Sequence, residues 1–164
     1  ITLKMSVRQS VFETNSSSMH SFSFYGEPEY GTITPDRDGI VEITFWEYGR
    51  GYEKYTNPID KANYIATGLF NTEWPGKDDM ERYPRADHLY EYKGDNPDIL
   101  KFEEVIKDQT NCKVVLYRLD NSLWSWGEYG FIDHQSTDVR QDMFANLKES
   151  IFRRWTLEID NDNH

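Results

Sequence analysis

The sequence predicts an α+β fold: one compact domain with an antiparallel or mixed sheet and about three helices. Residues 40–48 alternate between apolar and polar side chains, which is the period of a half-buried strand. Asn57-Pro58 and Asn96-Pro97 each place an N-cap residue before a proline at the first helical position. Strand-like segments precede and follow these helices, an order typical of α+β domains.

The individual elements follow in chain order. Strands are predicted over 5–12, 21–24, 40–48 and 112–119, and helices over 58–70, 97–110 and from about 138 to 151. Residues 71–94 contain Pro75, Gly76 and Pro84 and predict a long surface excursion. The acidic, asparagine-rich segment 158–164 is expected to fray. The predicted domain therefore covers residues 1–157.

Composition limits the classes of partner. The chain has 164 residues, enough to bury a core, and its 15% aromatic content offsets a low apolar fraction. The 29 acidic residues outnumber the 18 basic ones, for a formal charge of −11. This charge disfavours direct nucleic-acid binding and suits a host protein with a basic surface. Solubility alone also explains an acidic chain.

Two features of the sequence bear on the cellular compartment of the protein. Cys112 is the only cysteine, so no internal disulfide is expected and a reducing cytoplasm is the default. No secretory signal or membrane-spanning segment is recognisable, and no membrane association is predicted. Residues 1–4 precede Met5, which leaves open a natural start at Met5 or a trimmed chain. The sequence does not indicate an oligomeric state.

The segment 13–21 concentrates the polar chemistry of the chain in a loop predicted between two strands. Its hydroxyl and amide groups could bind an anion, and the candidate binding residues are Thr14, Asn15, Ser16, Ser17 and Ser18. Ser17 or a neighbour could instead act as a nucleophile activated by His20 or His134. A third interpretation is a turn whose side chains bond to their own backbone.

A second polar cluster, Asp133-His134-Gln135-Ser136, lies between a strand end and a helix start. His134 is the functional candidate, with Asp133 orienting its ring. Ser136 is a candidate binding residue, although capping of the following helix explains it more simply. No metal site or cofactor is predicted. An ADP-ribosyltransferase arrangement fits poorly, because the only Glu-x-Glu, at 27–29, lies in the wrong part of the chain.

Both clusters resemble parts of a group of small uncharacterised bacteriophage proteins. The resemblance is carried by 11–21, by 130–136 and by the closing 161–163. It implies a phage origin, and therefore the host cytoplasm, but no established activity. It also suggests that the serine-rich loop and Asp133-His134-Ser136 belong to one site, within about 12 Å of each other.

Three functions remain open at this point. The first is a phage-type accessory protein that binds a host macromolecule, for counter-defence or host takeover. The second is a small hydrolase or transferase acting on a phosphoester or nucleotide, with Ser17 as nucleophile or anion site, His20 and His134 as acid and base, and Asp133 orienting. The third is a structural component of the virion. The sequence alone does not decide whether the protein is an enzyme.

Overall fold

Two groups of residues account for the packing in this computed structural model. It describes residues 6–9, 18–24, 30–48, 52–70, 88–120, 131–132, 145–153 and 155–161. Unit 1 draws on residues 1–31, 47–61 and 132–164, and unit 2 on residues 32–46 and 62–131. Antiparallel and mixed sheets occur with three helices in the described residues, which confirms the predicted α+β class.

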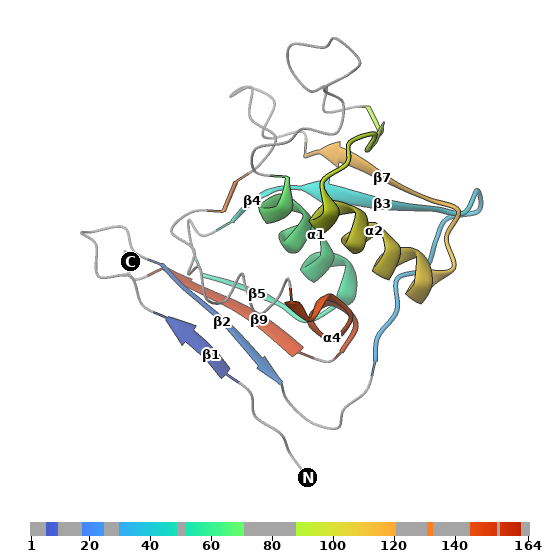
Figure 1. The fold of residues 1–164 in the computed structure, drawn as a ribbon. Helices are drawn as coiled ribbons and strands as arrows, with labels where there is room; N and C mark the ends of the chain where they lie inside the picture. Colours follow the sequence, from blue (N-terminus) through green and yellow to red (C-terminus); the bar gives the residue numbers. More distant parts are fainter. Residues whose placement is uncertain are drawn as a thin grey trace. The chain divides into compact units, whose positions relative to one another are not determined.

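Unit 1 contains a four-stranded antiparallel sheet. Its strands, in spatial order, are β1 (Ser6–Gln9), β2 (Ser18–Phe24), β9 (Trp155–Asn161) and β5 (Glu53–Tyr55). The central pair joins segments from opposite ends of the chain, as Figure 1 shows. Helix α4 (Leu147–Phe152) leads into β9 and buries Leu147, Ile151 and Phe152. Strand β4 (Glu47–Tyr48) pairs with β8 (Phe131–Ile132).

The expectation that the tail frays from Glu158 is wrong for residues 158–161. These residues belong to β9, where Leu157 and Ile159 are fully buried. Apolar residues alternate here with Thr156 and Glu158, which is the period of a strand. Strand β9 pairs with β2 along its length and with β5 at residues 157–159. The many acidic residues of this segment favoured the interpretation as a frayed tail over a strand with a two-residue period. Residues 162–164 lie outside the described part of the chain.

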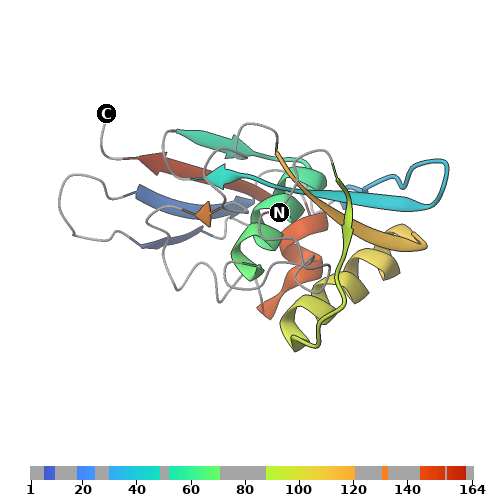
Figure 2. The same cartoon turned by 90° about the horizontal axis from the view of Figure 1, so that it is seen from above.

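Unit 2 contains a three-stranded mixed sheet with the order β3 (Ile40–Phe45), β7 (Val114–Leu119), β6 (Tyr90–Glu91). Strands β3 and β7 are parallel, and β6 is antiparallel to β7. One face is buried: Val41, Ile43 and Phe45 lie in register with Val115, Tyr117 and Leu119. Helix α2 (Pro97–Thr110) packs along the β3–β7 pair (Figure 2). The buried alternation predicted for residues 41–45 is confirmed.

Both predicted helix starts are confirmed. Helix α1 (Pro58–Leu69) begins after Asn57, whose side-chain oxygen accepts a hydrogen bond from the Asp60 amide at 2.9 Å. Helix α2 begins after Asn96, which accepts in the same way from the Asp98 amide at 3.0 Å. Each cap satisfies an amide that the helix itself leaves unpaired. Of the helix predicted from residue 138, the described residues confirm its end, α4.

Strand β3 lies at an edge of the mixed sheet, and α1 covers that edge with side chains. The Thr44 amide donates to Asn63 Oδ1 at 3.0 Å, and the Trp46 amide donates to Thr67 Oγ1 at 3.3 Å. Positions 63 and 67 are one helical turn apart, which matches the two-residue repeat of the strand. Exposed edge amides can pair with another chain, so this arrangement protects β3 from edge-to-edge association.

Replacing Asn63 with alanine should therefore weaken the fold of unit 2. The variant leaves the part-buried Thr44 amide without its acceptor, which costs about 1–3 kcal/mol of unfolding free energy. Asn63→Asp keeps an acceptor oxygen at the same position and is the matched control. Denaturant unfolding of both variants measures the difference. Equal stability of the alanine and aspartate variants would contradict a role for this bond.

Candidate functional site

The predicted site residues fall into two groups. His20 and Ser18 lie on β2, so they are strand residues and not part of the predicted loop, which extended to residue 21. The other candidates lie outside the described residues: Thr14, Asn15, Ser16, Ser17, Asp133, His134 and Ser136. The expected meeting of the two polar clusters therefore stays a prediction.

The sheet of unit 1 gives His20 a defined position. His20 is in register with Gln9 on β1 and with Ile159 on β9, and Ile159 is in turn in register with Glu53 on β5. Directly opposed residues share one face of a sheet. Position 20 therefore belongs to the face on which Ile159 and Leu157 are buried. Strand pairing on both sides therefore fixes the register of position 20.

Two acid–base groups of known geometry lie on the same face, on the edge strand β5. Tyr55 donates its hydroxyl to Glu53 Oε1 at 2.9 Å, and its ring packs edge-on against Tyr48 at 5.7 Å between centroids. Burial, followed by the bond to Glu53, raises the pKa of Tyr55 far above its usual value. The phenol is therefore held protonated as a donor. This row supplies a carboxylate and a phenol on the face to which position 20 belongs.

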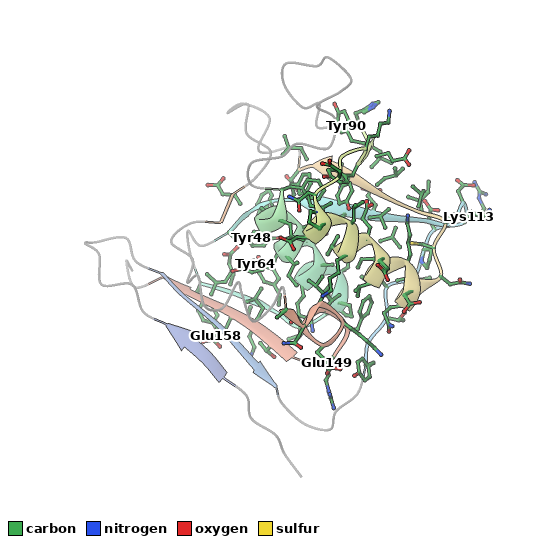
Figure 3. The ribbon with its side chains drawn as sticks, viewed as in Figure 1. Tyr48, Tyr64, Tyr90, Lys113, Glu149 and Glu158 are labelled. Carbon is green, nitrogen blue, oxygen red and sulfur yellow. The ribbon has the colours of Figure 1, made fainter. Side chains whose placement is uncertain are left out.

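A second cluster in unit 1 surrounds Tyr30, and we call its four residues, Tyr30, Lys148, Glu149 and Arg153, the Tyr30 cluster. The Tyr30 hydroxyl donates to Glu149 Oε1 at 2.5 Å, and Arg153 Nη1 donates to Glu149 Oε2 at 2.6 Å. The Arg153 guanidinium and the Lys148 ammonium lie 5.4 and 5.5 Å from the Tyr30 ring centroid. Figure 3 shows Glu149 on α4.

The ionisation of the Tyr30 cluster follows from these contacts. The hydrogen bond to Glu149 raises the pKa of Tyr30, because the charged acceptor favours the protonated phenol. Partial burial raises the pKa of Glu149, but the bonds from Tyr30 and Arg153 outweigh it and lower that pKa below its usual value. In this cluster an exposed phenol donates a hydrogen bond to a charged carboxylate, and two cationic side chains lie beside the phenol ring.

Lys61 is another titratable group of unit 1 whose pKa is strongly shifted. Its side chain is fully buried, and its ammonium donates to the Arg153 carbonyl oxygen at 2.6 Å, at the junction of α4 and β9. Burial lowers the pKa of Lys61 to about 8. Such an amine is partly neutral near physiological pH, as nucleophilic lysines are. Its lack of solvent exposure and its carbonyl partner point to a structural role.

Unit 2 contains a hydrogen-bonded pair of titratable side chains, Tyr117 and Glu103. The fully buried Tyr117 donates its hydroxyl to Glu103 Oε2 at 2.7 Å. Burial raises the pKa of Glu103, although the bond from Tyr117 and the charge of Lys107 oppose that shift. Glu103 also lines a shallow groove of about 540 Å³ along the outer side of α2. The remaining groove residues are Leu100, Glu104, Lys107, Asp108, Asn111 and Cys112.

Sequence reasoning missed Lys61 and the Tyr30 cluster. In the sequence, Ile59, Ala62, Ala66 and Leu69 form an apolar stripe at helical spacing, and this pattern predicts a solvated side for Lys61. Tyr64 and Ile65 were the available signal, because they make the helix apolar on a second side and both are fully buried. The Tyr30 cluster joins residues more than 110 positions apart, and no local sequence pattern predicts such a contact.

The described residues contain no group of three His, Cys, Asp or Glu side chains arranged to hold a metal ion. Within that same part of the chain, no helix has the length and apolar character needed to cross a bilayer. Comparisons with protein-family models, with curated proteins and with solved structures found no match for this chain. The candidate site is therefore defined by its own geometry, namely the His20 row of the unit 1 sheet and the Tyr30 cluster.

Proposed function

We propose that this protein is a phage-type accessory protein that acts in the host cytoplasm by binding a host protein with a basic surface. The observation that carries the proposal is the formal charge of −11 on a chain of 164 residues. Such a charge accelerates encounter with a positively charged partner and disfavours direct contact with nucleic acid. Counter-defence and host takeover are the two roles that fit a protein of this size and charge.

The described titratable groups support binding over catalysis. Lys61 is bonded to a backbone carbonyl, Glu103 to Tyr117, and Glu149 to both Tyr30 and Arg153. Each of these perturbed groups therefore has a partner that fixes the fold locally. Perturbed ionisation arises from structural networks as well as from active sites, and these partners favour the structural explanation.

A hydrolase or transferase acting on a phosphoester or nucleotide is the second candidate. One observation favours it: position 20 is in register with Ile159, Ile159 is in register with Glu53, and Glu53 accepts a hydrogen bond from Tyr55. In this alternative His20 and His134 act as acid and base, Asp133 orients, and Ser17 supplies the nucleophile or anion site.

Affinity capture from bacterial lysate distinguishes the two candidates. We expect the tagged protein to retain one host protein in stoichiometric amount at about 50 mM salt and to release most of it at about 300 mM. A variant with Ser17→Ala and His134→Ala should retain the partner equally. The opposite outcome is a variant that keeps its fold but no longer causes the phenotype that the unmodified protein causes in the host. That result would favour the enzyme and contradict the binding proposal.

A charge-reversal pair sharpens this experiment. Glu104 and Asp108 are exposed on the outer side of α2, and reversing both to lysine changes the formal charge from −11 to −7, two per reversal. The association rate with the captured partner should fall about tenfold at low salt. The matched control, Lys101→Gln/Lys107→Gln on the same helix, makes the chain more acidic and should not slow association. An unchanged rate in the reversal variant would contradict electrostatic steering.

A further inference from the structure

Helix α2 carries its groove beside the face that packs into the core of unit 2. Ile99, Phe102 and Ile106 form the buried face. The helix residues that line the groove recur every three or four positions from Leu100 to Asn111, so they share one side of the helix. The groove has a volume of about 540 Å³ and is open to solvent. Pockets of this volume accommodate a drug-sized ligand, and an open one suits side chains presented by another protein.

Glu103 gives the groove a carboxylate of fixed position. Its Oε2 accepts the hydrogen bond from the buried Tyr117 hydroxyl at 2.7 Å. Its Oε1 has no hydrogen bond within the described residues and reaches solvent. Burial, together with the charge of Glu91 on β6, raises the pKa of Glu103, so its negative charge is only partly compensated by its surroundings. A cation that enters the groove therefore meets an oriented carboxylate with one oxygen available.

The other charged residues of the groove also favour a cation. Glu104 and Asp108 are exposed, and neither has a hydrogen bond or ion pair with any other described residue. They stand one helical turn apart, a spacing at which like charges repel each other. Among the described lining residues Lys107 is the one base, so three carboxylates and one ammonium give the groove a formal charge of −2.

An apolar side chain lies beside these charges. Leu100 is 46% exposed and lines the groove at the amino-terminal end of the row. The half-buried Cys112 lines its other end. Single exposed leucines are ordinary on protein surfaces. A leucine that shares a groove with an oriented carboxylate instead matches the centre of an interface, where apolar packing and an arginine contact are combined.

We propose that this groove receives a segment of the host partner in which an arginine stands beside an apolar residue. The inference rests on the proposed function, which supplies a partner with a basic surface. The guanidinium pairs with Glu103 Oε1, and the apolar side chain packs on Leu100. Arginine suits the groove better than lysine, because its planar group has five donors and can bond to more than one carboxylate. The formal charge of −2 in the groove complements such a segment.

The first test uses a defined probe, the peptide acetyl-Leu-Arg-Leu-Arg-amide, titrated into the isotope-labelled full chain and followed by NMR. At about 50 mM salt we expect the amide signals of residues 100–112 to shift, and Glu103→Gln to weaken binding at least about tenfold. This variant keeps an acceptor oxygen for Tyr117 and removes the charge. Asp95→Asn, the matched control, removes one charge from an exposed position before α2 and should bind the peptide as tightly as the unmodified protein. Absence of the shifts, or equal affinity of Glu103→Gln and the unmodified protein, overturns the proposal.

The second test separates this inference from the proposed function. Leu100→Gln changes an exposed side chain and should weaken binding of the captured host partner at least about fivefold, whereas Lys101→Gln on the same helix should not. A partner that binds Leu100→Gln and Glu103→Gln as tightly as the unmodified protein overturns the groove inference and leaves the proposed function standing. If no partner is captured, the proposed function fails, and peptide binding that depends on Glu103 still supports the groove. Dimers that form in the unmodified protein but not in Leu100→Gln would assign the groove to a second copy of the chain and overturn the proposal.

Discussion

Replacing Lys61 with methionine is expected to remove a rise in stability between pH 7 and pH 9.5. Methionine fills similar space without an amine, so it removes the titration of a fully buried group. The unfolding free energy of the unmodified protein should increase by about 2 kcal/mol over this range, while that of the variant stays nearly flat. Denaturant unfolding at the two pH values measures both slopes.

The sign follows from the lowered pKa of Lys61, about 8 in the fold against 10.5 for the unperturbed side chain. Below pH 8 both states carry the proton, and the native state bears the full cost of a buried charge. Between pH 8 and 10.5 the unfolded chain binds more protons than the folded one, so stability rises with pH. The raised pKa values of Tyr55 and Tyr117 act in the opposite direction, but only above about pH 10.

Lys54→Met is the matched control for this experiment. Lys54 lies on β5 in the same unit, and its side chain is exposed, so the substitution removes a lysine without affecting a buried charge. Its unfolding free energy should follow the slope of the unmodified protein. Equal slopes for Lys61→Met and the unmodified protein would show that Lys61 does not titrate in this range, and the burial argument would be wrong.

Local signals predicted the two longer helices and strand β3 well. Asn57-Pro58 and Asn96-Pro97 are complete start signals within two residues, and the buried positions of α2 and β3 follow simple periods. Strand β7 begins at Val114, two residues later than predicted, because α2 ends in a left-handed Asn111 and the chain needs residues 112–113 to turn. These features depend on neighbours in the sequence.

Unit 1 was harder to predict because its sheet is assembled from distant segments. Strand β9 was hidden by Glu158 and Asp160, and its identity depends on β2 and β5, which lie more than 90 residues earlier. The same holds for Lys61, whose burial is decided by the junction of α4 and β9. Periodicity identifies one amphipathic side of an element, but a second buried side depends on contacts that local sequence does not encode.

Truncating Tyr117 to alanine is expected to give the largest loss of stability in unit 2, about 3–5 kcal/mol of unfolding free energy. Its ring stacks on Phe45 at 5.6 Å and meets Phe70 at 4.7 Å, and Phe70 contacts Tyr92 edge-on at 5.3 Å. Removing the central ring leaves a cavity beside Phe45 and Phe70, since the neighbouring rings are held by their own contacts. Denaturant unfolding measures the loss.

Tyr117→Phe separates the ring from its hydroxyl and tests the bond to Glu103. The ring contacts remain, but the carboxylate loses a donor, so the expected loss at pH 7 is about 1–3 kcal/mol. Without that donor, burial raises the pKa of Glu103 further, and the carboxyl is neutral over a wider range. Lowering the pH protonates Glu103 in both proteins and replaces a charged acceptor by a neutral one. The difference between Tyr117→Phe and the unmodified protein should therefore shrink toward pH 4, and a difference that stays constant with pH would contradict a charge-assisted bond.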